Sequence, residues 1–488
     1  MSSRSSAAVV TLALSLITQS LLAQSPFAAL QRDIDALLAA PALERAFWGV
    51  LVKPVDRDEI VYSLNAGKLM TPASTMKVVT LAAAAEKLGW DYTYATRLFA
   101  AGTIDNGGLH GDLVVVGSGD PTIDDWDGKA TLLFADWAAQ LKAAGIVRID
   151  GRIVGDDNAF DDDGLGQGWA WDDMAASFSA SVSALQFNEG SVQLNIAPGA
   201  SVGARASVTM SPDYSGLTVN NLISTGGSGS TAAVIRRRFP GTPRLELRGL
   251  LPLRMRPFSE TASVDNPTLY FVTALRRALV ANGIDVQGAA IDVDDLDAPP
   301  IRVGAPIVTH RSPPLSMLAT TMMRLSQNLY AETLLKTIGA DSAELATTES
   351  GRAAVRSILQ SWNIASGSLV QADGSGLSRY NLITPEAMVA ILLHVNRDSR
   401  LRSGFEGTLP VAGRNGTLEN RMRGTAAEGN AKVKTGSLTG VRAMAGYVRT
   451  QDGETLAFTI FANNYENSSS AINAACDAIV GRLASFRR

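Results

Sequence analysis

Three short polar motifs that lie far apart along the 488-residue chain are the strongest constraint on its fold. In chain order they are Ser74 with Lys77, Ser326-Gln327-Asn328, and Lys434-Thr435-Gly436. Their hydroxyl and amine groups can activate a nucleophile only if the three stretches meet in space. The first two motifs are 252 residues apart, whereas the second and third are 108 apart. A 252-residue span is too long for a loop in a compact domain, so it is expected to hold domains of its own.

The first motif places a serine and a lysine on one face of a predicted helix. Pro72 suits a first helical turn, the stretch 78–88 keeps helical character, and Gly89 can end it. Residues i and i+3 share a helix face, so the Lys77 amine can reach the Ser74 hydroxyl and take its proton. A serine three residues before a lysine is also common on solvated helix faces, so this pair gains its meaning from the other two motifs.

Segments from both ends of the chain are predicted to share one sheet. Two strands precede the first motif, three strands begin at the third motif, and a helix closes the chain. These elements are expected at 48–55, 59–64, 432–438, 441–449, 454–463 and 468–484. We therefore predict an α/β (α+β) catalytic domain in which an antiparallel sheet is flanked by the helices that carry the serines.

The long middle span is predicted to hold two nested inserted domains. Strands are expected at 111–117, 149–155 and 284–293, with a helix at 269–282. Between them, the stretch from residue 188 to about residue 257 is strand-like with Gly, Ser and Pro punctuation, which indicates a mainly β module. The predicted division is a catalytic domain over 24–97 and 303–488, domain II over 98–187 and 259–302, and a β-rich domain III over 188–258.

The first 23 residues are predicted to be a cleaved signal peptide. Arg4 is the only charged residue among them, and an apolar stretch covers 7–22. This stretch is short for a membrane span, and an uncleaved N-terminal anchor is the alternative. We therefore expect an exported, periplasmic protein with no transmembrane span after cleavage.

Composition argues against several kinds of site and partner. The net charge of −4 gives no reason to expect nucleic acid as a partner. Cys476 is the only cysteine, so an intramolecular disulfide is impossible and a thiolate metal site is not expected. The three histidines, His110, His310 and His394, are scattered along the chain, so no metal and no cofactor are predicted.

The three motifs, in this combination and order, are the signature of penicillin-binding proteins and class A β-lactamases. With its long insertion, the chain resembles the class C low-molecular-mass penicillin-binding proteins, the D-alanyl-D-alanine carboxypeptidase/endopeptidase family. Further matching segments are GSGDPT (117–122), FSA (178–180), NLYAETL (328–334), DGSGLS (373–378) and LPVAG (409–413). The resemblance covers essentially the whole mature chain. It implies a penicillin-binding/β-lactamase-like fold and a serine DD-peptidase that acts on peptidoglycan stem peptides and is acylated by β-lactam antibiotics.

The resemblance also implies a role for each catalytic residue. Ser74 is expected to attack the carbonyl of the penultimate D-alanine, with Lys77 as its base. A free lysine is protonated near neutral pH, so burial and a second cation, Lys434, are expected to favour the neutral amine of Lys77. Ser326 is expected to relay a proton to the leaving amine, and Asn328 to bind the substrate's backbone amide or to hold Lys77. Taken alone, Ser326 to Asn328 would be interpreted as a helix cap or turn.

Substrate-binding residues are expected on the strand that carries the third motif. Lys434 and Thr435 are expected to hold the terminal carboxylate of the substrate. Gly436 would let the backbone come close to the substrate, and the resemblance places the oxyanion hole at the N–H groups of Ser74 and Ser437. An ordinary polar edge strand is the alternative for this segment.

An acidic run between residues 156 and 173 contains one further candidate. It lacks the spacing of a calcium loop, and a solvated loop is the alternative. By the resemblance, Asp173, with Asp172 as a close rival, meets the free ammonium at the end of a diaminopimelate side chain. The segment 373–378 is expected only to shape a loop near the site.

Two other functions compete with that of a DD-carboxypeptidase. A β-lactamase or esterase on the same machinery would need a carboxylate positioned to activate water, which no motif clearly supplies. A non-catalytic wall-binding or scaffolding protein would not need the hydroxyls and amines of the three motifs together. The predicted function is therefore a serine D-alanyl-D-alanine carboxypeptidase, with DD-endopeptidase activity expected beside it. The sequence does not indicate an oligomeric state.

Overall fold

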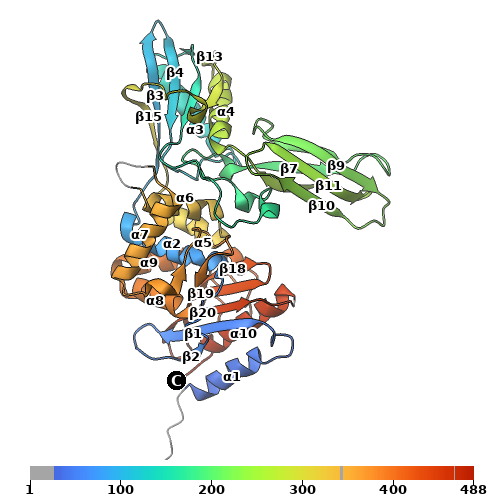
Figure 1. Cartoon of the computed structure of the whole chain (residues 1–488), viewed down its shortest axis with the longest axis vertical. Coiled ribbons are helices and arrows are strands. Elements are labelled where there is room, and N and C mark those ends of the chain that lie inside the picture. The colour runs from blue at the N-terminus through green and yellow to red at the C-terminus, as the bar shows by residue number, and fades with distance from the viewer. Residues whose placement is uncertain (1–26, 341–344, 467) are drawn as a thin grey trace, which may run out of the picture.

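The computed structural model describes residues 27–340, 345–466 and 468–488, so the predicted signal peptide lies outside the described residues. Figure 1 shows a lower body that contains both ends of the described chain, a second body at the opposite end of the molecule, and a β-rich part that projects sideways between them. None of the helices in the described ranges has the length and apolar character that crossing a membrane requires.

A five-stranded antiparallel sheet forms the centre of the lower body, in the order β18-β19-β20-β1-β2. Its strands are β1 Phe47–Pro54, β2 Tyr62–Leu64, β18 Lys432–Leu438, β19 Val441–Arg449 and β20 Thr455–Asn463. Pairing of β1 with β20 along its whole length joins the two ends of the chain, with Phe47 opposite Asn463 and Pro54 opposite Leu456. The predicted antiparallel sheet is therefore confirmed.

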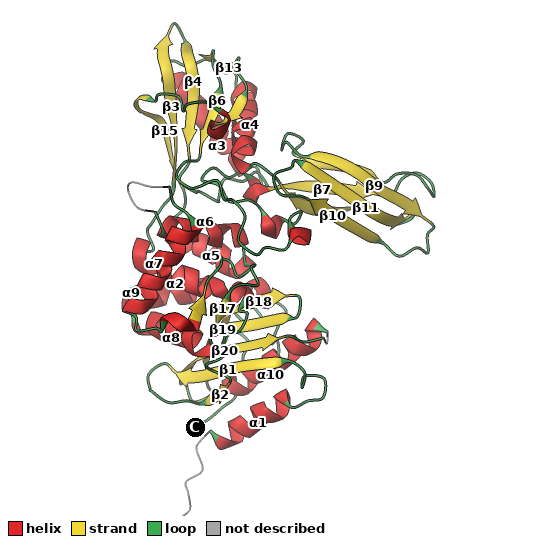
Figure 2. Cartoon of the chain, in the orientation of Figure 1, coloured by secondary structure: helices red, strands yellow, loops and turns green. Residues whose placement is uncertain are grey.

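Alternation of side chains gives this sheet an apolar core on each face. On β1, Val50 and Val52 pack with α1 (Ala28–Leu38) and α10 (Ser469–Ala484), whereas Leu51 packs with the helices of the opposite face. Figure 2 shows the sheet between these two helical layers. The helices of the opposite face are α2 Met76–Leu88, α5 Leu315–Leu325, α6 Asn328–Ile338, α7 Thr348–Ser361, α8 Pro385–Arg397 and α9 Ser399–Thr408.

A seven-stranded sheet with two helices forms the second body. Its strands are β3 Ala95–Asp105, β4 Gly108–Val116, β5 Arg148–Ile149, β6 Ile153–Asp156, β13 Asp285–Val286, β14 Ala290–Asp292 and β15 Val303–Arg311. The helices α3 Lys129–Ala143 and α4 Pro267–Ala281 share one apolar core with it. The strands predicted at 149–155 and 284–293 are each split in two. At these breaks the backbones nearly touch, because a Cβ on Gly288 would lie 2.2 Å from the Gly151 carbonyl oxygen.

One strand of this sheet lies beyond the predicted domain boundaries. β15 pairs with β3, whereas the boundaries at 97/98 and 302/303 assign it to the catalytic domain. The first three residues of β15 are exposed and Pro306 follows them, so the strand has no continuous apolar pattern that would reveal its partner.

Two three-stranded sheets form the projecting part, in the orders β10-β11-β9 and β12-β7-β8. The strands are β7 Ser191–Ala197, β8 Ser207–Ser211, β9 Thr218–Gly226, β10 Ala233–Arg238, β11 Arg244–Pro252 and β12 Phe258–Ser263. Their inner side chains, such as Leu194 of β7 and Leu247 of β11, belong to the same apolar core as α3 and α4. β12 pairs with β7, so the β-rich part extends past residue 258, where the predicted domain III ends.

The turn that carries Ser74 is held between two other segments. A short 3₁₀ turn, Ala73–Thr75, precedes α2, so the helix begins later than Pro72 indicated. Gly376 has a φ of +86°, and a Cβ there would lie 1.8 Å from the Ala73 carbonyl oxygen. On the other side, a Cβ on Gly436 would lie 2.7 Å from the Pro72 carbonyl oxygen. Two glycines therefore allow the loop 373–378 and β18 to fix the position of Ser74.

Gly376→Ala is expected to lower the free energy of unfolding by more than about 1 kcal/mol, because it adds a methyl group against backbone at a positive φ. The shift in the urea unfolding midpoint, at unchanged slope, measures this effect. Gly367→Ala is the matched control, since a Cβ there meets nothing within 4 Å. Equal midpoints for Gly376→Ala and the control would contradict the close packing described above.

Candidate active site

The Lys77 amine is fully buried and bonded to three different segments of the chain. Its Nζ lies 3.2 Å from Ser74 Oγ, 2.6 Å from Asn328 Oδ1 and 2.8 Å from the Ser375 carbonyl oxygen. The first contact joins the two residues of the first motif, as the i, i+3 spacing predicts. The other two bring α6 and the loop 373–378 to the same nitrogen atom.

Burial sets the proton affinity of Lys77. It lowers the pKa of the amine from 10.5 to about 7, although the charges of Glu332 and Asp373 oppose this change. The partners at Asn328 and Ser375 are neutral oxygens, so no direct ion pair within the described ranges stabilises the ammonium form. Near neutral pH a substantial fraction of Lys77 is therefore neutral and can accept a proton.

Lys434 of β18 is the second buried amine of the site. Its Nζ donates to Ser326 Oγ at 2.8 Å and to the Thr435 carbonyl oxygen at 2.8 Å. Burial, and next the charge of Lys77, lower the pKa of Lys434 well below its usual value. Ser326 itself lies in the turn between α5 and α6 with a φ of 61°. The second and third motifs therefore meet through one hydrogen bond.

Asn328, the first residue of α6, holds Lys77 and also lines the cleft, so its role toward a substrate amide stays a prediction. Its Oδ1 accepts from Lys77, and the carbonyl oxygen of Phe178 beside its amide nitrogen can only accept, so the orientation of the amide group is determined. The amide nitrogen donates to the Phe178 carbonyl oxygen at 2.9 Å. Both ends of this side chain are therefore used by the protein.

Glu332 and Asp373 are structural parts of the site that the motif analysis did not single out. The Glu332 carboxylate accepts from the backbone N–H groups of Gly374 and Ser375, each at 2.8 Å. Asp373 accepts from the N–H groups of Gly376 at 2.8 Å and of Ser378 at 2.6 Å. Burial and the Asp373 charge raise the pKa of Glu332 to about 7.

A signal for Glu332 was present in the sequence. It lies four residues after Asn328 in NLYAETL, which puts both side chains on one helix face. Its own function could not be inferred from this spacing, because the backbone N–H groups that it binds belong to the separate loop 373–378.

A cleft of about 600 Å³ opens beside these residues. Its lining residues are Ser74, Asp173, Phe178, Ser326, Asn328, Leu377, Ser437, Leu438, Thr439, Gly440, Arg442, Tyr465, Glu466 and Ser469. Asp173 lines the cleft, whereas its rival Asp172 is exposed and is not among the lining residues. Burial, and next the charge of Asp172, raise the pKa of Asp173.

The remaining substrate-binding candidates lie on β18. Thr435 Oγ1 donates to Thr417 Oγ1 at 2.7 Å, so its hydroxyl is held at the edge of the strand. Gly436 lies against the turn of Ser74: a Cβ on it would be 3.0 Å from the Ser74 backbone nitrogen, in addition to its contact with Pro72. The close approach expected at Gly436 is therefore to the nucleophile turn. The oxyanion hole at the N–H groups of Ser74 and Ser437 stays a prediction.

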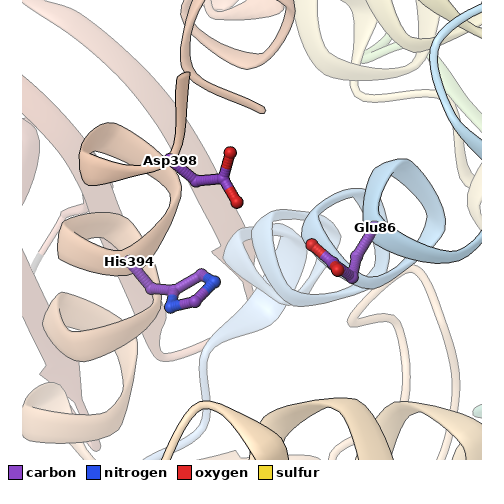
Figure 3. A group of neighbouring side chains, drawn as sticks. All are labelled: Glu86, His394 and Asp398. Atoms are coloured by element: carbon purple, nitrogen blue, oxygen red, sulfur yellow. The ribbon is translucent and has the colours of Figure 1, made fainter. Parts of the chain in front are cut away.

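Two side-chain groups among the described residues have ligand atoms close enough to hold a metal ion. Figure 3 shows the first, Glu86, His394 and Asp398, whose side chains point toward one another. The Arg400 guanidinium already lies 3.2 Å from the Glu86 carboxylate and 2.6 Å from that of Asp398. The second group is Asp157, Asp292 and Asp294. Neither group lines the cleft, so we assign no metal to the site.

Comparisons with known proteins agree with this geometry. Residues 30–486 match the model of the D-Ala-D-Ala carboxypeptidase 3 (S13) family. A D-alanyl-D-alanine carboxypeptidase from an Actinomadura species is 35% identical, over 99% of this chain and 91% of that protein.

Solved structures show the same fold over nearly the whole chain. Penicillin binding protein 4 (DacB) from Haemophilus influenzae superposes with a TM-score of 0.82 at 28% identity, over 93% of this chain and 100% of that one. The same protein in complex with a β-lactam gives a TM-score of 0.77 at 26% identity, with the same coverage of both chains. The chain therefore belongs to the D-Ala-D-Ala carboxypeptidase 3 (S13) family, and it is a serine-type D-Ala-D-Ala carboxypeptidase.

Proposed function

We propose that this carboxypeptidase acts outside the cytoplasmic membrane on peptidoglycan stem peptides, that it also cuts peptide cross-links as a DD-endopeptidase, and that β-lactams acylate Ser74. The observation that carries the proposal is the contact of the buried Lys77 amine with Ser74 Oγ at 3.2 Å beside an open cleft. Carboxypeptidase and endopeptidase reactions both hydrolyse the bond after a D-alanine, so one nucleophile serves both.

Acylation begins with attack by Ser74 Oγ on the carbonyl carbon of the penultimate D-alanine. The hydroxyl proton passes to the neutral Lys77 amine as the C–O bond forms. The tetrahedral intermediate then expels the terminal residue as an amine, which receives a proton through Ser326 from the Lys434 side. Water hydrolyses the resulting ester, so Ser74 is regenerated and the shortened peptide leaves.

The substrate's own carboxylate helps to place the protons before attack. Burial lowers the pKa of Lys77 and the charges of Glu332 and Asp373 oppose this change, whereas none of the carboxylates that the structure describes opposes it in this way at Lys434. A terminal carboxylate bound beside Lys434 stabilises the ammonium form of that residue. Lys434 then holds the proton that passes through Ser326 to the leaving amine.

The position of the nearby carboxylates argues against the β-lactamase alternative. Both Glu332 oxygens accept backbone N–H groups of the loop 373–378, so this carboxylate is not available to orient a hydrolytic water. The extracellular location rests on the predicted signal peptide, and action on β-lactams is supported by the related Haemophilus influenzae protein solved with such a compound.

The rate of acylation by penicillin is expected to rise with pH and to level off above about pH 7, because only the neutral Lys77 amine accepts the Ser74 proton. Below that pKa the rate should fall about tenfold per pH unit. Rapid-quench labelling with a fluorescent penicillin measures it, and circular dichroism at each pH checks that the protein stays folded. A rate that does not vary between about pH 5 and about pH 8 would show that Lys77 is not the base.

Wild-type protein is expected to take up one fluorescent penicillin per chain, to remove one D-alanine from pentapeptide muropeptides and to split cross-linked dimers. Ser74→Ala should lose all three activities, because no other residue supplies the nucleophile. Ser63→Ala, at an exposed position on β2, is the control. Mass spectrometry of the protein and of the muropeptides gives the readout. If the wild-type protein removed D-alanine from pentapeptides but left cross-linked dimers uncut, only the proposed endopeptidase activity would be contradicted.

Asp173→Asn is expected to lower kcat/KM about tenfold or more for a diaminopimelate peptide with a free side-chain ammonium, because a charge-assisted hydrogen bond is lost. The effect should be much smaller for a peptide whose side-chain amine is acetylated. Asp172→Asn is the matched control, since Asp172 does not line the cleft. Equal losses on both peptides, or a larger loss in Asp172→Asn, would refute the assignment of Asp173.

A further inference from the structure

The cleft extends past the catalytic residues to an end that no part of the mechanism uses, where one arginine and one glutamate face it. Beyond Ser437, its lining continues through Leu438, Thr439 and Gly440 to Arg442, at the turn between β18 and β19. Glu466 and Ser469 line the opposite side of this end. The Arg442 guanidinium is the cation among the lining residues.

The protein holds the Arg442 side chain in place without neutralising it. Its Nη1 donates to the Leu438 carbonyl oxygen at 3.0 Å and to the Val441 carbonyl oxygen at 2.7 Å. In the part of the chain that the structure describes, no carboxylate lies within ion-pair distance of this guanidinium. Glu466 lines the same cleft but does not pair with Arg442. Glu466 is mostly exposed and lies 3.6 Å from Arg45 instead. Arg442 therefore presents its other donors in a fixed position, which suits recognition of a carboxylate.

The direction of a bound stem peptide follows from the two ends of β18. Lys434 and Thr435 are proposed to hold the terminal carboxylate, so the residues before the scissile bond extend the opposite way, past Ser437 toward Gly440. The third residue of the stem, the diamino acid, then lies beside the wall formed by Asp173. The residue before it is a D-glutamate joined through its side-chain carboxyl, which leaves its α-carboxylate free. On this path we expect the α-carboxylate at the end of the cleft where Arg442 lies.

We propose that Arg442 binds the free α-carboxylate of the γ-linked D-glutamyl residue and makes the enzyme prefer stem peptides in which this carboxylate is not amidated. The inference rests on the proposed action on stem peptides. It adds a residue that determines specificity at a distance from the scissile bond. It also predicts that the enzyme discriminates between stem peptides with a free glutamyl α-carboxylate and those in which this group is a carboxamide.

The test compares kcat/KM for two pentapeptides, L-Ala-γ-D-Glu-diaminopimelate-D-Ala-D-Ala and its isoglutamine counterpart. Wild type is expected to prefer the free carboxylate about tenfold or more, as loss of a charge-assisted bond implies. Arg442→Gln should bring this ratio close to one, and Arg442→Lys should keep part of it. Arg449→Gln, which removes a cation from the exposed far end of β19, should leave the ratio at the wild-type value.

Two measurements separate a specificity role from a structural one. Penicillin acylation and hydrolysis of diacetyl-L-Lys-D-Ala-D-Ala, which lacks the glutamyl residue, report on the shared catalytic machinery of each variant. If Arg442→Gln fails to fold, the ratio of kcat/KM for the two pentapeptides in wild type and in Arg442→Lys still tests the role of Arg442. A wild-type ratio near one, or a full ratio retained in Arg442→Gln, would overturn the role of Arg442. If wild type cleaves the short peptide but neither pentapeptide, the proposal on stem peptides falls and this inference with it.

Discussion

Two buried lysine amines, Lys77 bonded to Ser74 and Lys434 bonded to Ser326, are the constraint on which the rest of the site depends. Among the residues that the structure describes, neither Lys77 nor Lys434 has a carboxylate as a direct partner, and burial lowers the pKa of both. In solution such an amine would be protonated and useless as a base near neutral pH. The protein obtains a base by surrounding Lys77 with neutral oxygens from separate segments, so acylation chemistry requires that the tertiary structure be complete.

The loop 373–378 links the Glu332 carboxylate of α6 to the turn that carries the nucleophile. Glu332 binds two backbone N–H groups of this loop, the Ser375 carbonyl oxygen then accepts from Lys77, and Gly376 packs against the turn of Ser74. A carboxylate that does not line the cleft therefore helps to determine where the base and the nucleophile lie. The Glu332 charge also acts on Lys77 directly, because it opposes the lowering of the Lys77 pKa by burial.

Much of this arrangement could be predicted from the sequence because it is local or repeats along the chain. The i, i+3 spacing of Ser74 and Lys77 and the alternating strands at both ends depend on neighbouring residues alone. Contacts between distant segments could not be predicted in this way. The pairing of β15 with β3 could not be predicted because the exposed start of β15 carries no apolar pattern. The close approach at Gly436 is to Pro72 and Ser74, more than 350 residues away in sequence.

The inserted segments also contribute to the catalytic centre. Phe178 supplies a carbonyl oxygen that fixes the Asn328 amide, and Trp169 Nε1 donates to Asp373 at 3.0 Å, so a stretch from the insertion contacts both the second motif and the loop 373–378. Asp173, between these two residues, forms part of the cleft wall. If this stretch moved, the Asn328 amide would turn and the surroundings of Lys77 would change. The cleft wall formed by Asp173 would shift as well. One stretch of the insertion therefore forms part of the cleft wall and also holds the orientation of Asn328.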